Sequence, residues 1–408
     1  MRITTSMMFD SGTRNILDLQ GSLYKLQDQL STGRRILTPA DDPVAAAQAL
    51  VVSQRASVNT QFIDNQASAS SQLSELEDRY SAMVDLLQSV KARVVDAGNA
   101  AYSDSNRRAI SAEIRERYDE LLGLANATDA QGQHVFSGFR GDTRPFSVSG
   151  SPGGRTISYA GDEGKRQMQV ETDRVMDLSD SGADVFMRIP QGNGIFEFSP
   201  GAANTGTGTI GAYSMITGFN GSTYDISFTS STSYSLVVTT NGVPAPATGP
   251  FAYVPGQDIV LGSGSQQFKV VIGGAPNAGD AFTAAPSTNK DVFSTLDQMI
   301  SALESPVAVN DVTKAQFRNQ MTEISNNLDQ VMDRFLTRQT SIGARRIELE
   351  ALSNVGADLN LQYQTDMSRL QDLDFTEAIS SMANRKMVLE AAQLSFKQVS
   401  QMSLFNYL

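Results

Sequence analysis

The sequence contains no cysteine and no tryptophan, and its single histidine is His134. Without cysteine the chain can form neither disulfides nor thiolate metal sites. With one histidine it cannot build a zinc site of the His-x-x-x-His kind. The 32 basic residues are outnumbered by 44 acidic ones, which gives a net charge of −12. Sequence-independent nucleic-acid binding needs clustered cations, so we expect no nucleic-acid partner.

Long apolar runs are also missing. No stretch reaches the roughly 18 apolar residues of a membrane span, so we expect no membrane-embedded segment. Residues 1–10 lack the apolar core of a secretory signal peptide. An extracellular location would therefore require export without a cleaved signal peptide.

Glycine and proline are unevenly distributed. Residues 141–287 hold 23 of the 32 glycines and 10 of the 13 prolines. Between Ser179 and Ala285 the only basic residues are Arg188 and Lys269. This composition favours turns and short strands in the centre, and it separates the centre from both ends of the chain.

Both ends carry seams, by which we mean apolar residues at alternating steps of three and four along one helix face. The amino-terminal seam is Ile16, Leu19, Leu23, Leu26 and Leu30. The next is Leu73, Leu76, Tyr80, Met83, Leu87, Val90 and Val94. The longest consists of Phe317, Met321, Ile324, Leu328, Val331, Phe335, Ile342, Leu349, Leu352, Leu359 and Tyr363. Heptad spacing sustained over this length predicts paired, coiled-coil-like helices.

Three residues interrupt the longest seam: Arg338, Arg345 and Gly356. The arginines either fix register against carboxylates on a partner helix or extend their charged ends to water. Helix boundaries are better marked. Asp42 followed by Pro43 predicts an N-cap with proline at the first helical position, in a helix that runs to Ala97. Residues 103–105, Ser-Asp-Ser, predict the start of another helix.

The centre has the alternating pattern of half-buried strands. Residues 156–159 and 224–228 alternate apolar and polar, and residues 267–272 form a strand-like run that ends in Gly273-Gly274. Asn241-Gly242 after residues 234–240 predicts a hairpin. We therefore expect an α+β multidomain fold, in which a long antiparallel coiled-coil rod from both chain ends carries an inserted antiparallel β domain. The expected divisions are terminal helices at 1–40 and 371–408, the rod at 41–140 and 288–370, and the insert at 141–287.

The two termini are the candidate functional region. A carboxy-terminal stripe matches the amino-terminal seam, and it comprises Phe375, Ile379, Met382, Leu389, Phe396, Leu404, Phe405, Tyr407 and Leu408. An isolated amphipathic helix of this length is marginal in water. The two stripes could pair with each other, or they could stay disordered in the monomer until other copies bury them. Either way, we predict that they form an assembly interface.

Several stretches resemble the flagellin superfamily, and within it the hook–filament junction family called hook-associated protein 3. They are residues 30–43 (Leu-Ser-Thr-Gly-Arg-Arg-Ile-Leu-Thr-Pro-Ala-Asp-Asp-Pro), 131–146, 275–283 with 291–296, 373–379 and 403–408. These motifs cover both arms, whereas residues 147–274 match nothing recognisable and are interpreted from pattern alone.

The resemblance implies a structural, non-enzymatic subunit that joins the hook to the flagellin filament. It implies an inner layer of terminal helices, a middle layer of longer helices and an outer β domain. The expected partners are further copies in a ring or helical segment, the first hook-associated protein, flagellin, and a cytoplasmic export chaperone at the carboxy-terminal helix. The expected location is the extracellular flagellum, reached through its type III export apparatus. No cofactor or metal is implied.

Other motifs have simpler explanations. A Ser-His-Asp site around His134 is arithmetically possible, but a packing or surface histidine is the default. Residues 206–211 spell Gly-x-Gly-x-x-Gly without the βαβ setting of a dinucleotide site, which favours a loop. Arg140-Gly141-Asp142 is expected to form a turn, and Asp41-Asp42 is better explained by helix capping than by a metal or acid/base pair.

Two alternative functions remain open at this stage. The nearer one is a filament flagellin, which a proline-bearing segment at residues 38–43 and an Asn-Tyr-Leu ending make less favourable. The other is an extracellular adhesin whose β insert binds a glycan through the Tyr- and Thr-rich residues 213–240.

Overall fold

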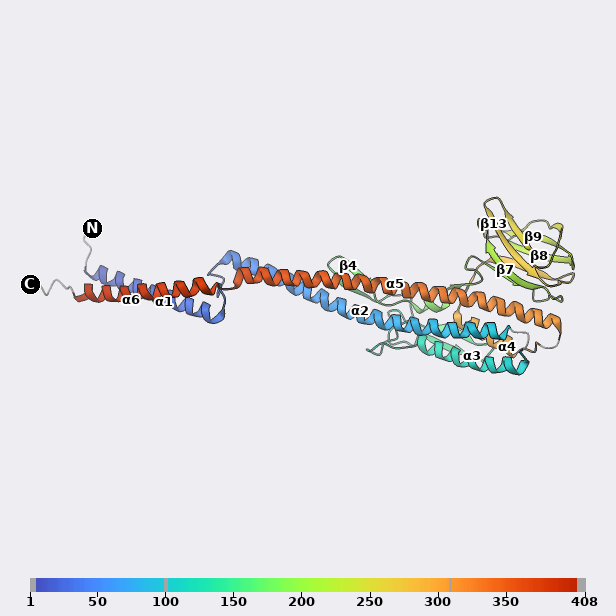
Figure 1. Cartoon of the computed structure of the whole chain (residues 1–408), viewed down its shortest axis with the longest axis horizontal. Helices are drawn as coiled ribbons and strands as arrows, with labels where there is room; N and C mark the ends of the chain where they lie inside the picture. The colour runs from blue at the N-terminus through green and yellow to red at the C-terminus, as the bar shows by residue number, and fades with distance from the viewer. Residues whose placement is uncertain (1–4, 99–101, 308–309, 402–408) are drawn as a thin grey trace, which may run out of the picture. The chain divides into compact units, whose positions relative to one another are not determined.

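A computed structural model describes residues 5–98, 102–307 and 310–401. The helices are α1 (Thr5–Thr32), α2 (Pro43–Ala97), α3 (Asp104–Ala125), α4 (Val292–Glu304), α5 (Asp311–Gln371) and α6 (Phe375–Gln401). These residues form two compact units, here called unit 1 (residues within 1–66 and 351–408) and unit 2 (67–350), and α2 and α5 contribute to both (Figure 1).

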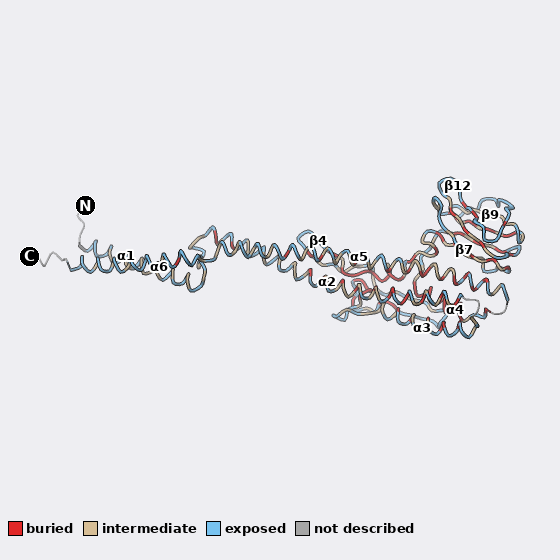
Figure 2. Tube along the Cα trace, in the orientation of Figure 1, coloured by how far each residue is buried: buried red, intermediate tan, exposed pale blue. Residues whose placement is uncertain are grey.

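Unit 2 is built on the predicted helical seams. Every member of the α2 seam from Leu73 to Val94 is buried, and so are the α5 seam residues from Phe317 to Phe335. Ion pairs join Lys91 to Asp329 and Glu77 to Arg346, so the two helices run antiparallel here. Helices α3 and α4 pack on each other, with Tyr118 and Phe293 ring centroids 5.7 Å apart. Figure 2 shows these buried positions along unit 2.

The arginines that interrupt the α5 seam bind the end of a strand and the loop after it instead of another helix. Arg338 lies 3.6 Å from the buried carboxylate of Asp180, and Arg345 donates a hydrogen bond to the backbone oxygen of Asp177 at 3.1 Å. The loop follows β4 (Arg174–Asp177). Neither expected alternative describes this arrangement fully, because the carboxylate partner exists but does not lie on a helix.

The remaining strands are β1 (Phe146–Ser149), β2 (Thr156–Tyr159), β3 (Gln167–Glu171), β5 (Ile189–Pro190), β6 (Phe196–Pro200), β7 (Thr209–Met215), β8 (Thr223–Ser230), β9 (Ser233–Thr240), β10 (Val243–Pro244), β11 (Thr248–Ala252), β12 (Asp258–Ser263), β13 (Gln266–Gly273), β14 (Ala281–Pro286) and β15 (Asn289–Lys290). A short π-helical turn spans Ala183–Met187. The 6-stranded sheet has the order β10-β9-β8-β14-β6, with β11 also pairing β9, and the 3-stranded sheet has the order β12-β13-β7.

The two larger sheets share one aromatic core. Phe196 of the 6-stranded sheet and Phe268 of the 3-stranded sheet have ring centroids 4.8 Å apart, and both side chains are fully buried. The β9–β10 hairpin turns at Asn241 and Gly242, whose φ angles are 51° and 78°. A two-residue turn with both angles positive is the conformation that the Asn-Gly pair favours.

Asparagine side chains of α5 hold the β region. The buried Asn319 accepts a hydrogen bond from the Ile210 amide at 2.7 Å and donates one to the Gly208 carbonyl at 3.0 Å. Asn327, also buried, accepts one from the Gly192 amide at 2.9 Å. The predicted α+β fold, with helices from both ends of the chain and a central antiparallel β region, is confirmed.

Candidate assembly interface

The predicted interface residues lie on α1 and α6 of unit 1. The five residues of the α1 seam are each half-buried, and so are Met382, Leu389 and Phe396 of α6. Phe375 and Ile379 remain exposed, at 52% and 58%. Leu404, Phe405, Tyr407 and Leu408 lie outside the described residues.

The two terminal helices pack antiparallel against each other. The rings of Phe9 and Phe396 have centroids 4.6 Å apart in an edge-to-face arrangement. A Cβ added to Gly12 would lie 2.8 Å from the Phe396 ring, so glycine permits this close approach. Of the two alternatives for the stripes, mutual pairing is the one present in this structure. Their disorder in a free monomer stays a prediction.

This pairing leaves apolar surface uncovered on both helices. Leu17 and Tyr24 of α1 are 59% and 68% exposed, and Met387 and Leu394 of α6 are 66% and 64% exposed. Apolar residues at heptad spacing on a solvated helix face are typical of an interface that awaits another chain.

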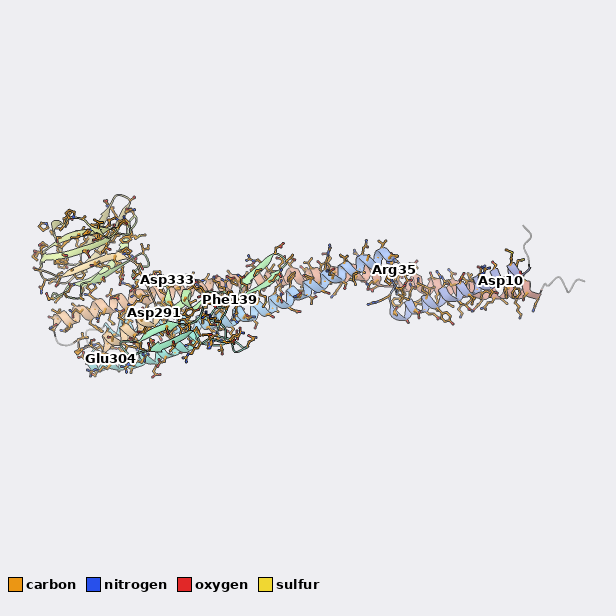
Figure 3. All side chains as sticks on the ribbon, turned by 180° about the vertical axis from the view of Figure 1, so that it is seen from behind. Asp10, Arg35, Phe139, Asp291, Glu304 and Asp333 are labelled. Atoms are coloured by element: carbon orange, nitrogen blue, oxygen red, sulfur yellow. The ribbon has the colours of Figure 1, made fainter. Side chains whose placement is uncertain are left out.

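Backbone hydrogen bonds join the segments that follow α1 and α5. The Arg35 amide donates to the Gln371 carbonyl at 2.7 Å, and the Leu373 amide donates to the Gly33 carbonyl at 2.9 Å. Figure 3 labels Arg35. Its guanidinium also donates a hydrogen bond to the Leu370 carbonyl at 2.9 Å. Gly33 has φ 70°, a left-handed conformation that favours glycine. No sequence pattern indicated the anchoring role of Arg35.

The Asp41-Asp42 pair organises the start of α2. The Asp42 carboxylate accepts a hydrogen bond from the Ala45 amide at 3.0 Å, and Pro43 is the first helical residue. The Asp41 carboxylate accepts from the Thr38 amide at 2.9 Å and binds the Lys25 ammonium at 2.5 Å. The hydrogen bond from Lys25, followed by that from Thr38, lowers the pKa of Asp41 to about 2. Each carboxylate therefore has partners within the fold.

The other motifs with possible chemistry are also engaged in structural contacts. The Nδ1 atom of His134 lies 2.6 Å from the Asn126 carbonyl oxygen, so that nitrogen carries the proton and donates. The Gly206 amide donates to the buried Asp280 carboxylate at 3.0 Å, and a strand rather than a helix follows this glycine-rich loop. The Arg140 carbonyl accepts from the Thr143 amide at 2.8 Å, which closes a turn.

Comparison with known proteins gives two findings. Residues 3–140 match the bacterial flagellin N-terminal helical region. Over 405 residues the chain is 27% identical to flagellar hook-associated protein 3 of Salmonella typhimurium, with 99% of each chain covered. The chain is therefore similar to hook-associated protein 3 along nearly the whole of both sequences. The resemblance of the motif-bearing arms to this family is thereby confirmed, and it extends over residues 147–274, where no motif was recognised.

The solved structures point the same way. The flagellar junction protein FlgL of Legionella pneumophila has a TM-score of 0.68 and 28% identity, with 80% of this chain and 100% of that chain covered. Filament proteins match a smaller part. Flagellin B of Helicobacter pylori is 30% identical over 127 residues, which is 31% of this chain and 24% of that one. The similarity to hook-associated protein 3 spans both chains, whereas this similarity to a flagellin covers less than a third of either chain.

Proposed function

We propose that this chain is a structural subunit of the bacterial flagellum that joins the hook to the flagellin filament. The observation that carries the proposal is the 99% mutual coverage with hook-associated protein 3. The exposed apolar faces of α1 and α6 support a subunit that assembles through its terminal helices. A filament flagellin is the less favourable alternative, because the match to Flagellin B covers only 24% of that protein.

We infer that the role is mechanical and not catalytic. The only histidine bonds a backbone carbonyl through Nδ1, and the amides of the glycine-rich loop at residues 205–206 bind Asp280. Within the described residues no group of three His, Asp or Glu side chains is placed to hold a metal ion. The relatives are structural flagellar proteins, which agrees with this inference.

The partners that we propose are other copies of the chain, the first hook-associated protein on the hook side and flagellin on the filament side. Residues 1–40 and 371–408 are the proposed assembly helices, 41–140 with 288–370 the proposed rod, and 141–287 the proposed outer domain.

We further propose that the chain is extracellular, that it leaves the cell through the flagellar export apparatus, and that a cytoplasmic chaperone holds α6 beforehand. Across the part of the chain that is described, no helix is long and apolar enough to cross a membrane.

The glycan-binding alternative has less support. A polar cleft of about 410 Å³ lies between β7 and α5, and Tyr213, Asn326 and Asp329 contribute to its lining. Asn326 donates a hydrogen bond to the Tyr213 hydroxyl at 3.0 Å, and Asp329 pairs with Lys91. The first of these contacts joins α5 to β7 and the second joins α5 to α2, which favours a structural explanation of the cleft.

Deletion of the gene tests the proposal. We expect hooks without filaments and flagellin released into the medium, with filaments restored by the full chain supplied in trans. Normal filaments in the deletion strain would contradict a junction role. Protein abundance separates junction from filament, because a filament protein must be present in great excess over any junction protein.

A further inference from the structure

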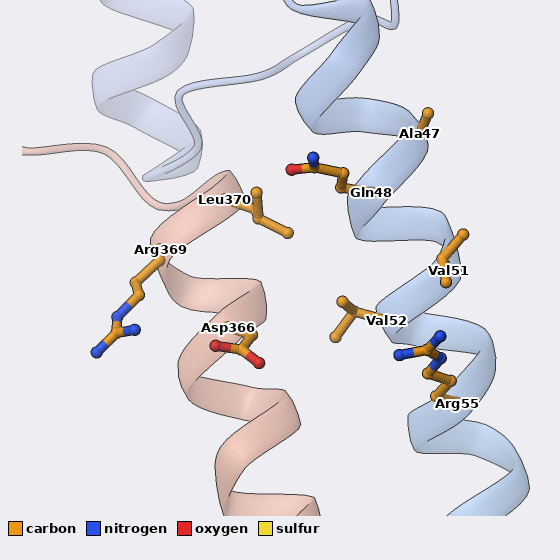
Figure 4. Close-up of a pocket in the computed structure, with 8 residues that line it drawn as sticks. All are labelled: Ala47, Gln48, Val51, Val52, Arg55, Asp366, Arg369 and Leu370. Atoms are coloured by element: carbon orange, nitrogen blue, oxygen red, sulfur yellow. The ribbon is translucent and has the colours of Figure 1, made fainter.

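A groove lies between α2 and α5 within unit 1. It has a volume of about 560 Å³, and its lining includes the apolar Val51, Val52 and Leu370 and the charged Arg55, Asp366 and Arg369. Figure 4 shows Val52 and Leu370 pointing toward one another across it. Along its α2 side, Val51 is 48% exposed. The groove thus offers apolar surface between two helices to an additional helix.

Two cations, Arg55 and Arg369, and one carboxylate, Asp366, line the groove, so its net charge is positive. Arg55 and Arg369 form no ion pair or hydrogen bond through their side chains with any other described residue, and both are exposed. Cations at the edge of an apolar groove favour an occupant that carries apolar side chains and a carboxylate. The chain as a whole is acidic, at −12, so such a carboxylate is readily supplied by another copy.

The outer face of α1 has these features. Leu17, Gly21, Tyr24 and Asp28 follow at steps of four, three and four, so they lie on one helix face. Leu17 and Tyr24 are the exposed apolar residues of that face. The Asp28 carboxylate, which is exposed, has no bonding partner among the described residues.

Gly21 leaves room for a close neighbour on this face. Glycine inside a helix is less stable than alanine, so its presence usually has a packing reason. For Gly12 that reason is Phe396, which a Cβ would approach to 2.8 Å. At Gly21, however, a Cβ would meet no atom within 4 Å. Among the described residues nothing covers Gly21, so this position leaves the outer face of α1 open to the close approach of a second helix.

We propose that the outer face of α1 in one copy docks into the α2/α5 groove of a second copy. Leu17 and Tyr24 enter the groove, Gly21 lets the helices approach closely, and Asp28 pairs with Arg369. The inference rests on the proposed assembly role and deepens it, because it states which surfaces of two copies meet.

Cysteine cross-linking tests the contact without background, since the natural chain has no cysteine. Two differently tagged full-length copies are produced together, one with Tyr24→Cys and the other with Val51→Cys, and isolated flagella are treated with a short bismaleimide. We expect a covalent dimer that carries both tags. The control pairs Tyr24→Cys with Ile347→Cys, an equally accessible site at 70% exposure in unit 2, and should give none. Absence of the dimer while both variants are present in flagella would overturn the proposal.

Two substitutions provide a second test. Gly21→Leu should prevent incorporation into flagella, whereas Gly123→Leu in α3 should not, although a Cβ at either glycine meets nothing within 4 Å. Arg369→Glu should reduce incorporation several-fold, and Asp28→Lys in the same chain should restore it. Normal incorporation of Gly21→Leu would contradict the proposed close approach.

The two proposals fail in distinguishable ways. If the chain is absent from flagella altogether, the junction role is wrong. The same tagged cysteine pairs, mixed as purified full-length proteins, then decide the docking, and a dimer would support the inference while its absence would refute it.

Discussion

Asp180 is the position at which the structure allows the sharpest prediction about stability. Its side chain is almost fully buried, with 1% exposure. It accepts a hydrogen bond from the Tyr80 hydroxyl at 3.0 Å and lies 3.6 Å from the guanidinium of Arg338. Asp180→Ala removes the partner of both groups at once.

The expected loss follows from these contacts. Breaking a buried ion pair by removing one partner costs about 3–5 kcal/mol. The Arg338 side chain is 20% exposed, so water can hydrate part of its charge once Asp180 is removed. We therefore expect Asp180→Ala to lower the free energy of unfolding by about 3 kcal/mol, near the lower end of that range. Tyr80→Phe removes one hydrogen bond to a charged group but leaves the ion pair, and should cost about 1.5 kcal/mol.

Urea unfolding of the full-length variants, followed by far-ultraviolet circular dichroism, measures these losses as midpoint shifts at unchanged slope. The double variant should be less destabilised than the sum of the single variants by about 1 kcal/mol, because both act on one network. Asp333→Ala, at an exposed position on α5, is the control and should stay within about 0.5 kcal/mol of the parent. Strict additivity, or an Asp180→Ala effect as small as the control, would refute the reasoning.

Three further predictions concern other parts of the molecule. Asn319→Ala should destabilise unit 2 by about 2–4 kcal/mol, because it leaves the buried Ile210 amide and Gly208 carbonyl unpaired. Thermal unfolding would measure the loss of stability, and an unchanged melting temperature would contradict the prediction. Burial raises the pKa of both Tyr118 and Tyr213 from 10.0 to about 12. The folded pKa values lie above the unfolded ones. The stability that the two protonated hydroxyls contribute to the folded state is therefore complete below pH 10.0, and it is lost as pH rises toward about 12. Urea midpoints should fall across that interval, and a flat profile would contradict the assignment. Removal of residues 1–38 and 373–408 should leave unit 2 folded by circular dichroism while abolishing attachment to hooks; continued attachment would show that the terminal helices are not the interface.

The helices and the hairpin could be predicted because their signals are local. The α5 seam repeats along the chain, Asp42-Pro43 marks a helix start, and Asn241-Gly242 specifies a turn. Each signal depends on residues within one or two turns of one another. The sequence therefore contains enough information to place these elements and to separate the glycine-rich centre from the arms.

The contacts between distant segments could not be predicted in the same way. Asn319 and Asn327 lie on a helix where polar side chains ordinarily face water, yet they bond the backbone of the β region more than 100 residues away in sequence. Arg338 looked like an interruption of an apolar seam, and its partner Asp180 lies in a loop. Gly356 also appeared as an interruption. In the structure its carbonyl accepts a hydrogen bond from Asn59 at 2.8 Å, and its missing side chain leaves space for Ile63.

The candidate interface was predictable only in part. The α1 seam and Met382, Leu389 and Phe396 of α6 are half-buried, whereas Phe375 and Ile379 of the same stripe stay exposed. A seam does not indicate which apolar residues remain exposed once two helices have paired. Leu17, Tyr24, Met387 and Leu394 became evident only with that pairing. The groove between α2 and α5 likewise depends on how two segments about 300 residues apart come together.

The most direct test of the account is immunoelectron microscopy of intact flagella with an antibody against this chain. We predict label confined to a short segment between hook and filament, with no label in a strain that lacks the gene. Label along the whole filament would identify a filament protein instead, and flagella without label in a strain that makes the chain would contradict a flagellar role.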